Sequence, residues 1–228
     1  MGEAGYVFMP QVIWLHLPQL AQGLLRTLGA SALGIVAAAL IGLVFGAARA
    51  YRVPVASQVA AAYVALFRGT PILVQIFFLY DALPELGIRL DVAEVAVLAL
   101  ALWGGSYNTE NFRAAFGAVP GGALQAAAAL GMPAHLRFAW IALPIAFRLV
   151  LPALGNTSIS VLKDSAYLSV IAFAELTYVA TNIVATEFRV FEMFAVLAVT
   201  YLGMVLLLSW GLSRITAHLA ARGTVGDA

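Results

Sequence analysis

Long apolar stretches alternate with short polar segments along the whole chain. Five of these stretches are long enough, as helices, to cross a bilayer core of about 30 Å. They lie at 27–48, 55–80, 92–116, 145–173 and 194–212. Most of the charged residues fall in the segments between them. This pattern predicts an all-α polytopic membrane protein with five transmembrane helices.

The basic residues are distributed unevenly, and this predicts the orientation of the spans. The only basic residues in loops 81–91 and 175–192 are Arg89 and Arg189, and Arg26 lies just before the start of the first span. The remaining inter-span segments and span ends hold seven basic residues: Arg49, Arg52, Arg113, Arg137, Arg148, Arg214 and Arg222. Because basic residues collect on the cytoplasmic side, we expect an N-out, C-in topology. Residues 1–20 are then expected to be an exposed or interfacial segment on the outer side.

The composition supports a membrane protein and excludes several other classes. The chain of 228 residues is 63% hydrophobic and 10% charged, whereas soluble domains contain about 25% charged residues. It contains no cysteine, which excludes disulfides and thiolate metal sites, and its three histidines lie in distant contexts, so we expect no metal site. No basic cluster indicates nucleic-acid binding. We expect a single transmembrane domain over 1–228, with its core at about 20–215.

The cytoplasmic segment 121–144 is punctuated like two short helices. Gly121-Gly122 precedes an alanine run that favours a helix, and Gly131 is suited to end it. Pro133 can open a second helix, and Pro144 is expected to end or bend what precedes it. The sequence therefore predicts a compact helix-turn-helix outside the bilayer.

The spacing within this segment resembles the EAA loop of bacterial ABC importer permeases. Three residues separate Ala126-Ala127 from Gly131, and nine more precede Ile141-Ala142-Leu143-Pro144; Gln125 stands where the family has Glu. The resemblance implies a type I importer-like fold whose coupling helix contacts an ATPase subunit. The coupling residues that it implies are Gln125, Ala126, Ala127, Gly131, Ile141, Leu143 and Pro144.

Three further stretches look like signatures of the polar amino acid uptake permeases, the histidine, glutamine and arginine type. They are Phe67-Arg68-Gly69-Thr70-Pro71, Tyr107 with Glu110 and Phe112-Arg113, and Leu162-Lys163-Asp164-Ser165. This resemblance implies a multi-pass subunit of the bacterial inner membrane that pairs with a second permease chain. It further implies an ATP-binding subunit that holds ATP and Mg²⁺, a solute-binding protein outside, and a polar amino acid as cargo. No cofactor is then expected in this chain itself.

Four charged residues within the predicted spans are candidates for a substrate pathway: Arg68, Glu110, Lys163 and Asp164. A charge at mid-bilayer costs about 2.5–3.5 kcal/mol on insertion scales, so each needs a partner or a wet cavity. In a substrate pathway, Arg68 could meet a carboxylate, and Asp164 or Glu110 an ammonium group. Alternatively, these charges pair with one another to fix the helix packing. Glu110 and Arg113 are three residues apart, which favours a local helical pair.

Two other function classes remain beside an ATP-driven importer. An ion-coupled secondary transporter would show inverted repeats, and the sequence has none that we recognise. An enzyme would gather catalytic residues at one depth, and the chain has no Walker A, H-E-x-x-H or G-x-S-x-G motif, so we expect no enzyme. The missing carboxylate at Gln125 suggests the hypothesis that this chain is one half of a heterodimer whose partner carries Glu.

Overall fold

The computed structural model describes residues 7–221, and this part of the chain is helical with no strand. Arg222, which contributes to the charge asymmetry, lies outside the described residues. The long helices are α1 (Pro10–Ala50), α4 (Val92–Gly117), α7 (Leu143–Asp164) and α9 (Val190–Ala221). The shorter ones are α2 (Ala56–Gly69), α3 (Ile72–Phe77), α5 (Gly121–Ala129), α6 (Ala134–Arg137) and α8 (Leu176–Glu187). Short π or 3-10 segments are η1 (Phe78–Ala82), η2 (Leu83–Leu86), η3 (Phe138–Ala142) and η4 (Ser165–Ile171).

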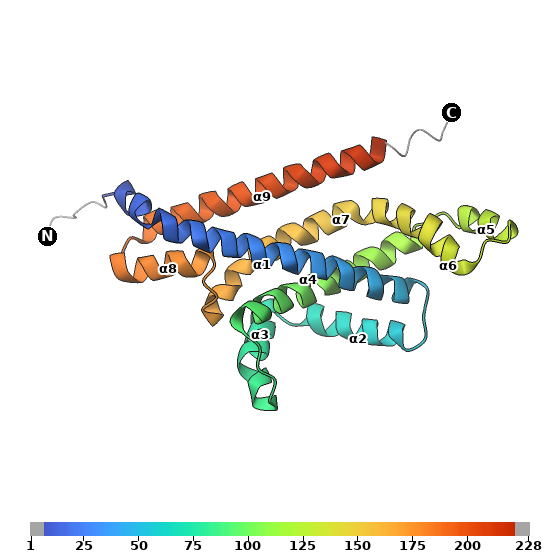
Figure 1. Cartoon of the computed structure of the whole chain (residues 1–228), viewed down its shortest axis with the longest axis horizontal. Helices are drawn as coiled ribbons and strands as arrows, with labels where there is room; N and C mark the ends of the chain where they lie inside the picture. The colour runs from blue at the N-terminus through green and yellow to red at the C-terminus, as the bar shows by residue number, and fades with distance from the viewer. Residues whose placement is uncertain (1–6, 222–228) are drawn as a thin grey trace.

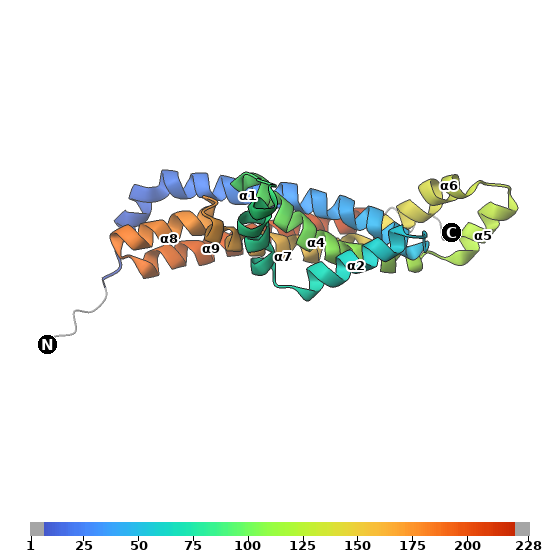
Figure 2. The same ribbon diagram turned by 90° about the horizontal axis from the view of Figure 1, so that it is seen from below.

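The four long helices run side by side and form an elongated bundle (Figures 1 and 2). Helix α8 lies at the end where α1 and α9 begin, whereas α5 and α6 lie at the opposite end. Helix α3 projects from the side of the bundle, across its long axis. The N-terminal end of α1 and the α5–α6 segment are therefore held at opposite ends of the molecule.

Helix α1 begins much earlier than the sequence pattern predicts. Residues 1–20 are expected to be an exposed or interfacial segment, and from Pro10 onward they belong to the same helix as the first span, which runs for 41 residues from Pro10 to Ala50. Pro10 occupies the first turn, where its missing N–H costs nothing. Pro18 lies inside the helix, and the helix continues through it.

The stretch 55–80 is broken rather than continuous. Helix α2 ends at Gly69, Thr70 has an extended backbone, and α3 begins after Pro71 at an angle of 108° to α2. Proline disfavours a helical conformation in the residue before it, which accounts for the break at Thr70. The stretch 55–80 is therefore sharply bent at Pro71, and it forms one span only if the bent pair crosses the membrane together.

Close packing of α1 on α4 depends on three small residues of α1. Gly34, Gly42 and Gly46 lie directly against Leu100, Asn108 and Phe112 of α4, respectively. A side chain at any of the three would collide with α4, so the glycines let the two helices approach closely. Gly29, on the same helix, faces open space.

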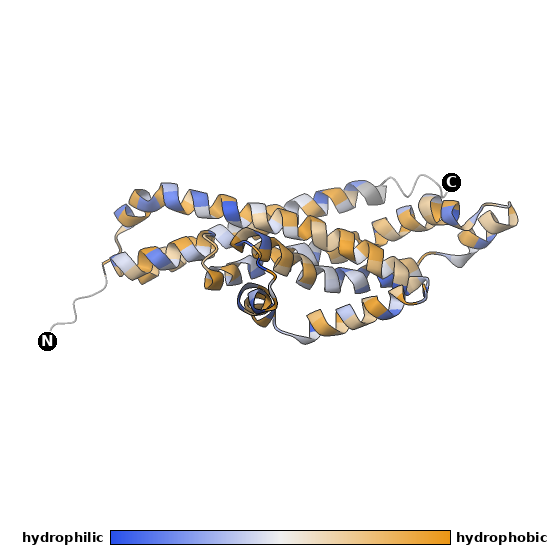
Figure 3. Ribbon diagram, turned by 60° about the horizontal axis from the view of Figure 1, so that its bottom comes forward, coloured by the Kyte–Doolittle hydropathy of each residue, from blue (hydrophilic) through white to orange (hydrophobic). Residues whose placement is uncertain are grey.

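Three helical stretches are long and apolar enough to cross a membrane: Pro10–Ala50, Ala134–Ile171 and Val190–His218. The bent pair α2 and α3 would be a fourth. Hydrophobic residues recur along the bundle helices (Figure 3), and many large ones are exposed, as expected of surfaces that face lipid. The chain is thus a multi-pass membrane protein, while the count of five spans and the N-out, C-in orientation stay predictions.

Candidate functional site

The turn between α5 and α6 has the hydrogen bonds of a Schellman motif. The Gly131 N–H donates to the Ala128 carbonyl and the Met132 N–H to the Ala127 carbonyl, each at 3.0 Å. Gly131 has φ +78°, a left-handed backbone conformation that residues with a Cβ rarely adopt. Pro133 caps α6 from its N-terminal side. Two short helices and a glycine turn are therefore confirmed in segment 121–144.

The coupling residues that the sequence predicts lie on both faces of this loop. Ala127 is buried, whereas Gln125 and Ala126 are exposed on α5. Leu130, between Ala126 and Gly131, is 88% exposed. An apolar side chain left so open at the tip of the molecule offers a contact for another protein.

Pro144 is expected to end or bend the second helix, and the structure excludes an end at this residue. Helix α6, the π-helical segment η3 and α7 form one continuous helical stretch, and Pro144 lies in the first turn of α7. Its proline nitrogen cannot donate to a carbonyl of the preceding turn, and the wider π turn accommodates that missing bond. Ile141 and Leu143, both partly buried, flank this point. The loop is therefore joined to α7 without a break, and the fourth stretch begins at Ala134 rather than near 145.

An aromatic cluster fixes the loop to the bundle. The Phe138 ring of η3 stacks on Phe116 of α4, with ring centroids 5.6 Å apart. Tyr51, just after α1, contacts both rings at 5.7 Å. A cavity of about 520 Å³ opens beside the cluster, lined also by Arg137 and Leu124. Movement of the loop would consequently be transmitted to the ends of α1 and α4.

Arg68 is held against an aromatic surface of α4. Its guanidinium carbon lies 4.8 Å from the centroid of the Tyr107 ring, within the range of a cation–π interaction. Tyr107 in turn packs on Trp103, with 4.7 Å between ring centroids. Arg68 is otherwise exposed, so its charge remains available to a ligand.

Glu110 is bound on both sides by arginines. One carboxylate oxygen pairs with Arg49 of α1, and the other lies 2.8 Å from the Arg113 Nη2. The local pair with Arg113 is confirmed, and the pair with Arg49 links α1 to α4 across 61 residues of chain. These contacts favour the structural use of Glu110 that the sequence leaves open.

Lys163 and Asp164 form the last turn of α7, away from the arginines that hold Glu110. Lys163 is exposed and Asp164 is partly buried. Within residues 7–221 the side chain of neither residue makes a hydrogen bond or a salt bridge. The structure therefore does not gather the four in-span charges into one cluster, and of the four only Glu110 forms a salt bridge among the described residues.

The sequence analysis did not identify the role of Gln75. Its Nε2 donates to the Phe67 carbonyl at 2.9 Å and to both the carbonyl and the hydroxyl of Thr70 at 3.0 Å. These are groups at the end of α2 that the break leaves without helical partners. The only signal in the sequence was a polar residue four positions after Pro71 in an apolar run.

Glu175 is a second residue whose role the sequence does not show. It is fully buried and caps α8, accepting from the Tyr178 N–H at 2.7 Å and the Thr177 N–H at 2.8 Å. The hydroxyls of Tyr201 of α9, at 3.1 Å, and Thr27 of α1, at 3.4 Å, also reach it. Burial raises the pKa of the Glu175 carboxyl, and these donors act against that rise. Glu175 thereby joins α1, α8 and α9.

Several long apolar helices, with two short helices and a glycine turn at one end of the bundle, define an integral membrane protein. The sequence model of the binding-protein-dependent transport system inner membrane component matches residues 30–222, and the chain belongs to that family. Its resemblance to ABC permeases of amino acids is thereby confirmed, and it is an inner membrane protein.

Individual relatives agree with this assignment. The glutamine transport system permease protein GlnP of Escherichia coli K12 is 38% identical over 209 residues, which cover 91% of this chain and 95% of that protein. The L-cystine transport system permease protein TcyB of Bacillus subtilis is 35% identical over 159 residues, 70% of this chain and 68% of that one. The chain is accordingly a permease subunit of an amino acid ABC importer, and permeases of this family are not enzymes.

Solved structures show the same fold. An amino acid ABC transporter crystallised with histidines matches with a TM-score of 0.84 and 33% identity, over 93% of this chain and all of that one. The methionine transporter MetNI, in an inward-facing conformation, matches with a TM-score of 0.72 and 18% identity, over 93% of this chain and 99% of that one. The type I importer permease fold is thus confirmed. Among residues 7–221, no group of three or more metal-ligating side chains could hold a metal ion.

Proposed function

We propose that this chain carries a polar amino acid inward across the membrane by alternating access, driven by a separate ATPase subunit and fed by a solute-binding protein. The chain acts as one permease domain, with residues 121–144 as its coupling loop. ATP and Mg²⁺ are bound by the ATPase, and a second permease subunit, identical or homologous, completes the pathway.

The α5–α6 loop is the observation that carries this proposal. It combines an exposed Leu130 beside a rigid glycine turn with a continuous helical connection into α7. A partner that pushes on Ala126, Gly131 and their neighbours would move Ile141, Leu143 and Pro144 with them. The stacked Phe138 and Phe116 rings would carry the same displacement to α4.

The cargo pathway is proposed to pass Arg68, Lys163 and Asp164. The exposed guanidinium of Arg68 would attract the substrate carboxylate, and the Asp164 carboxylate, which has no salt bridge, would attract its ammonium group. Glu110 belongs to the same set by sequence, but its two arginine partners support a packing role. Replacing Asp164→Asn should abolish uptake while the complex still assembles; unchanged uptake would remove Asp164 from the pathway.

We further propose a heterodimer in which the second permease chain provides the glutamate, because Gln125 stands where the family pattern has Glu. A carboxylate on only one of the two loops would make the coupling to the two ATPase subunits unequal. Purification of the complex through a tag on this chain tests the heterodimer. A complex that contains two copies of this chain and transports normally would contradict it.

The deciding experiment is uptake of radiolabelled amino acids into proteoliposomes that contain the purified complex. We expect uptake only with ATP, Mg²⁺ and the solute-binding protein, and binding measurements on that protein would identify the amino acid. Uptake driven by an ion gradient without ATP would instead establish an ion-coupled secondary transporter.

A further inference from the structure

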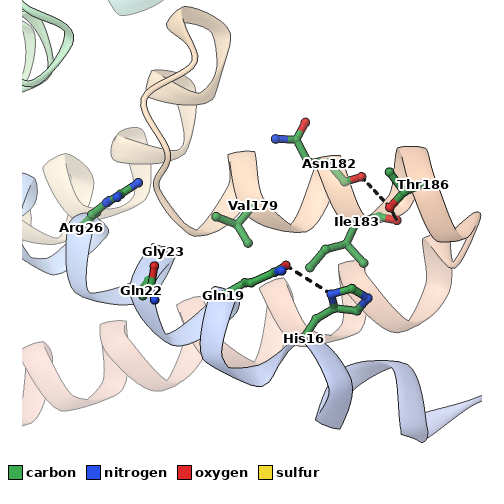
Figure 4. A pocket seen from close by; sticks show the side chains of 9 residues that line it. All are labelled: His16, Gln19, Gln22, Gly23, Arg26, Val179, Asn182, Ile183 and Thr186. Atoms are coloured by element: carbon green, nitrogen blue, oxygen red, sulfur yellow. Dashed lines mark hydrogen bonds between the residues drawn. The ribbon is translucent and has the colours of Figure 1, made fainter.

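A polar cleft of about 400 Å³ lies between the first half of α1 and helix α8 (Figure 4). Four of its polar side chains come from α1: His16, Gln19, Gln22 and Arg26. Asn182 and Thr186 line the cleft from α8. The cleft is at the end of the bundle opposite the α5–α6 loop (Figure 1), so it has no part in the coupling surface described above.

The two ends of the cleft differ in charge. At one end, the His16 Nε2 lies 3.5 Å from a carboxylate oxygen of Glu187, and the His16 Nδ1 lies 3.2 Å from the Gln19 side-chain oxygen. At the other end, Arg26 is exposed and makes one long hydrogen bond, to the Ala174 carbonyl at 3.4 Å. No carboxylate among residues 7–221 forms a salt bridge with Arg26. That end is therefore cationic, with most of its five N–H donors unused.

Between the two ends lie side-chain amide groups without a hydrogen-bond partner among residues 7–221. The side-chain amides of Gln22 and Asn182 are exposed and make no hydrogen bond to another described residue. Primary amides both donate and accept, so a pair of them is suited to the backbone of an extended peptide. The amides in the middle of the cleft can thus bind a peptide backbone, and Arg26 at its end can bind an anion.

The length of the cleft decides between a free amino acid and a protein segment. His16 and Arg26 are ten residues apart on one helix, which places them about 15 Å from each other along its axis. The ammonium and carboxylate groups of a free amino acid are adjacent and cannot reach both the Glu187 end and the Arg26 end. An extended segment of four or five residues covers that distance at about 3.3 Å per residue.

We infer that this cleft receives an extended segment of the solute-binding protein, with an acidic side chain of that segment on Arg26. The inference rests on the proposed function, in which this end of the bundle faces outward. The carboxylate on Arg26 makes a charge-assisted hydrogen bond, Gln22 and Asn182 bind the segment's backbone, and Glu187 with His16 closes the other end.

Stimulation of ATP hydrolysis measures this contact in the complete importer, reconstituted in lipid nanodiscs with its ATPase subunits and its purified, amino acid-loaded binding protein. Removing one partner of an interfacial charge pair commonly weakens binding by tenfold or more, so Arg26→Gln should raise the half-stimulating concentration about tenfold. Arg26→Lys should recover part of the loss. Arg89→Gln removes an exposed arginine outside the cleft and should change this concentration less than about twofold, because a surface charge away from the contact contributes little.

A second measurement leaves Arg26 in place. Since the chain has no cysteine, Asn182→Cys introduces a unique thiol in the cleft, and Arg89→Cys introduces one outside it. The binding protein should protect the first thiol, and not the second, from a membrane-impermeant maleimide. Equal stimulation of wild type and Arg26→Gln, together with unprotected labelling at position 182, would overturn the inference while the importer still works. If the binding protein neither stimulates the wild type nor supports uptake, the proposed function fails as well.

Discussion

Gln75 closes the break between α2 and α3 by donating its amide to both the carbonyl and the hydroxyl of Thr70, each at 3.0 Å. The same nitrogen also reaches the Phe67 carbonyl. A sharp bend in a membrane helix leaves backbone groups without partners, and membrane proteins satisfy them internally. One buried glutamine side chain therefore supports the 108° bend that directs α3 away from the bundle.

Replacing Gln75→Glu should destabilise this bend. An ionised glutamate keeps the size of the side chain but has no N–H to donate, so all three hydrogen bonds are lost. Leaving buried carbonyls unpaired costs about 1–3 kcal/mol. The thermal unfolding of the purified permease in detergent should shift to lower temperature. Val74→Ala, one position away and exposed, is the matched control, and an equal shift in both variants would show that Gln75 has no such role.

The two arginines on Glu110 should contribute unequally. The Arg49 side chain is 24% exposed, whereas the Arg113 side chain is 45% exposed and pairs within its own helix. Exposed ion pairs within one helix contribute about 0.3–0.5 kcal/mol to the free energy of unfolding, and less exposed ion pairs between helices contribute more. In double-mutant cycles of unfolding, the coupling of Glu110→Gln with Arg49→Gln should exceed its coupling with Arg113→Gln. The opposite order would mean that the link between α1 and α4 does not depend on this ion pair.

The sequence predicts local features of this fold better than contacts between distant segments. The apolar stretch 92–116 matches α4, Val92–Gly117, and the glycine and proline positions of 121–144 locate α5 and α6. These features depend on neighbouring residues. The partner of Glu110 on α1 is 61 residues away, and Glu175 and Thr27 are 148 residues apart, so neither pairing follows from spacing along the chain.

The start of α1 could not be predicted for a different reason. Residues 1–20 are mixed, with Trp14, His16 and Pro18, and this pattern is typical of an exposed or interfacial segment when the chain is considered alone. In the structure His16 and Gln19 line the cleft against α8, so the helix continues because another helix accompanies it. The same distinction applies to the candidate site. The α5–α6 loop could be predicted because it depends on neighbouring residues, whereas a substrate pathway depends on contacts between helices and could not.

Gly42→Ala should disrupt the packing of α1 on α4. A Cβ at position 42 would lie 2.7 Å from the backbone carbonyl carbon of Asn108, and backbone cannot move aside as a flexible side chain can. Overpacking of this kind costs about 1–3 kcal/mol. Gly29→Ala on the same helix meets nothing within 4 Å, and its better helix propensity should leave stability unchanged or slightly higher. Thermal unfolding of both variants checks this pair, and equal stability would contradict the close approach of the helices.

Gly131→Ala should weaken coupling rather than folding of the bundle. Alanine in the left-handed conformation costs about 1–2 kcal/mol, so the Schellman turn would lose its favoured geometry. Gly122→Ala, in the first turn of α5 with no neighbour within 4 Å, is the control. The ratio of amino acid transported to ATP hydrolysed should fall in Gly131→Ala and stay at the wild-type value in Gly122→Ala. A wild-type ratio in both variants would show that coupling does not need this turn.

The junction of α1, α8 and α9 should become less stable as pH rises. Glu175 lies outside the three apolar helical stretches and is fully buried, which raises the pKa of its carboxyl in the folded state. A group whose folded pKa is raised contributes stability below its unfolded pKa, about 4.3 for glutamate, and loses it as pH rises through the folded pKa. The neutral variant Glu175→Gln removes this titration. The difference in Tm, wild type minus Glu175→Gln, should therefore decrease between pH 4.5 and 7.5, and a constant or increasing difference would mean that the folded pKa is not raised.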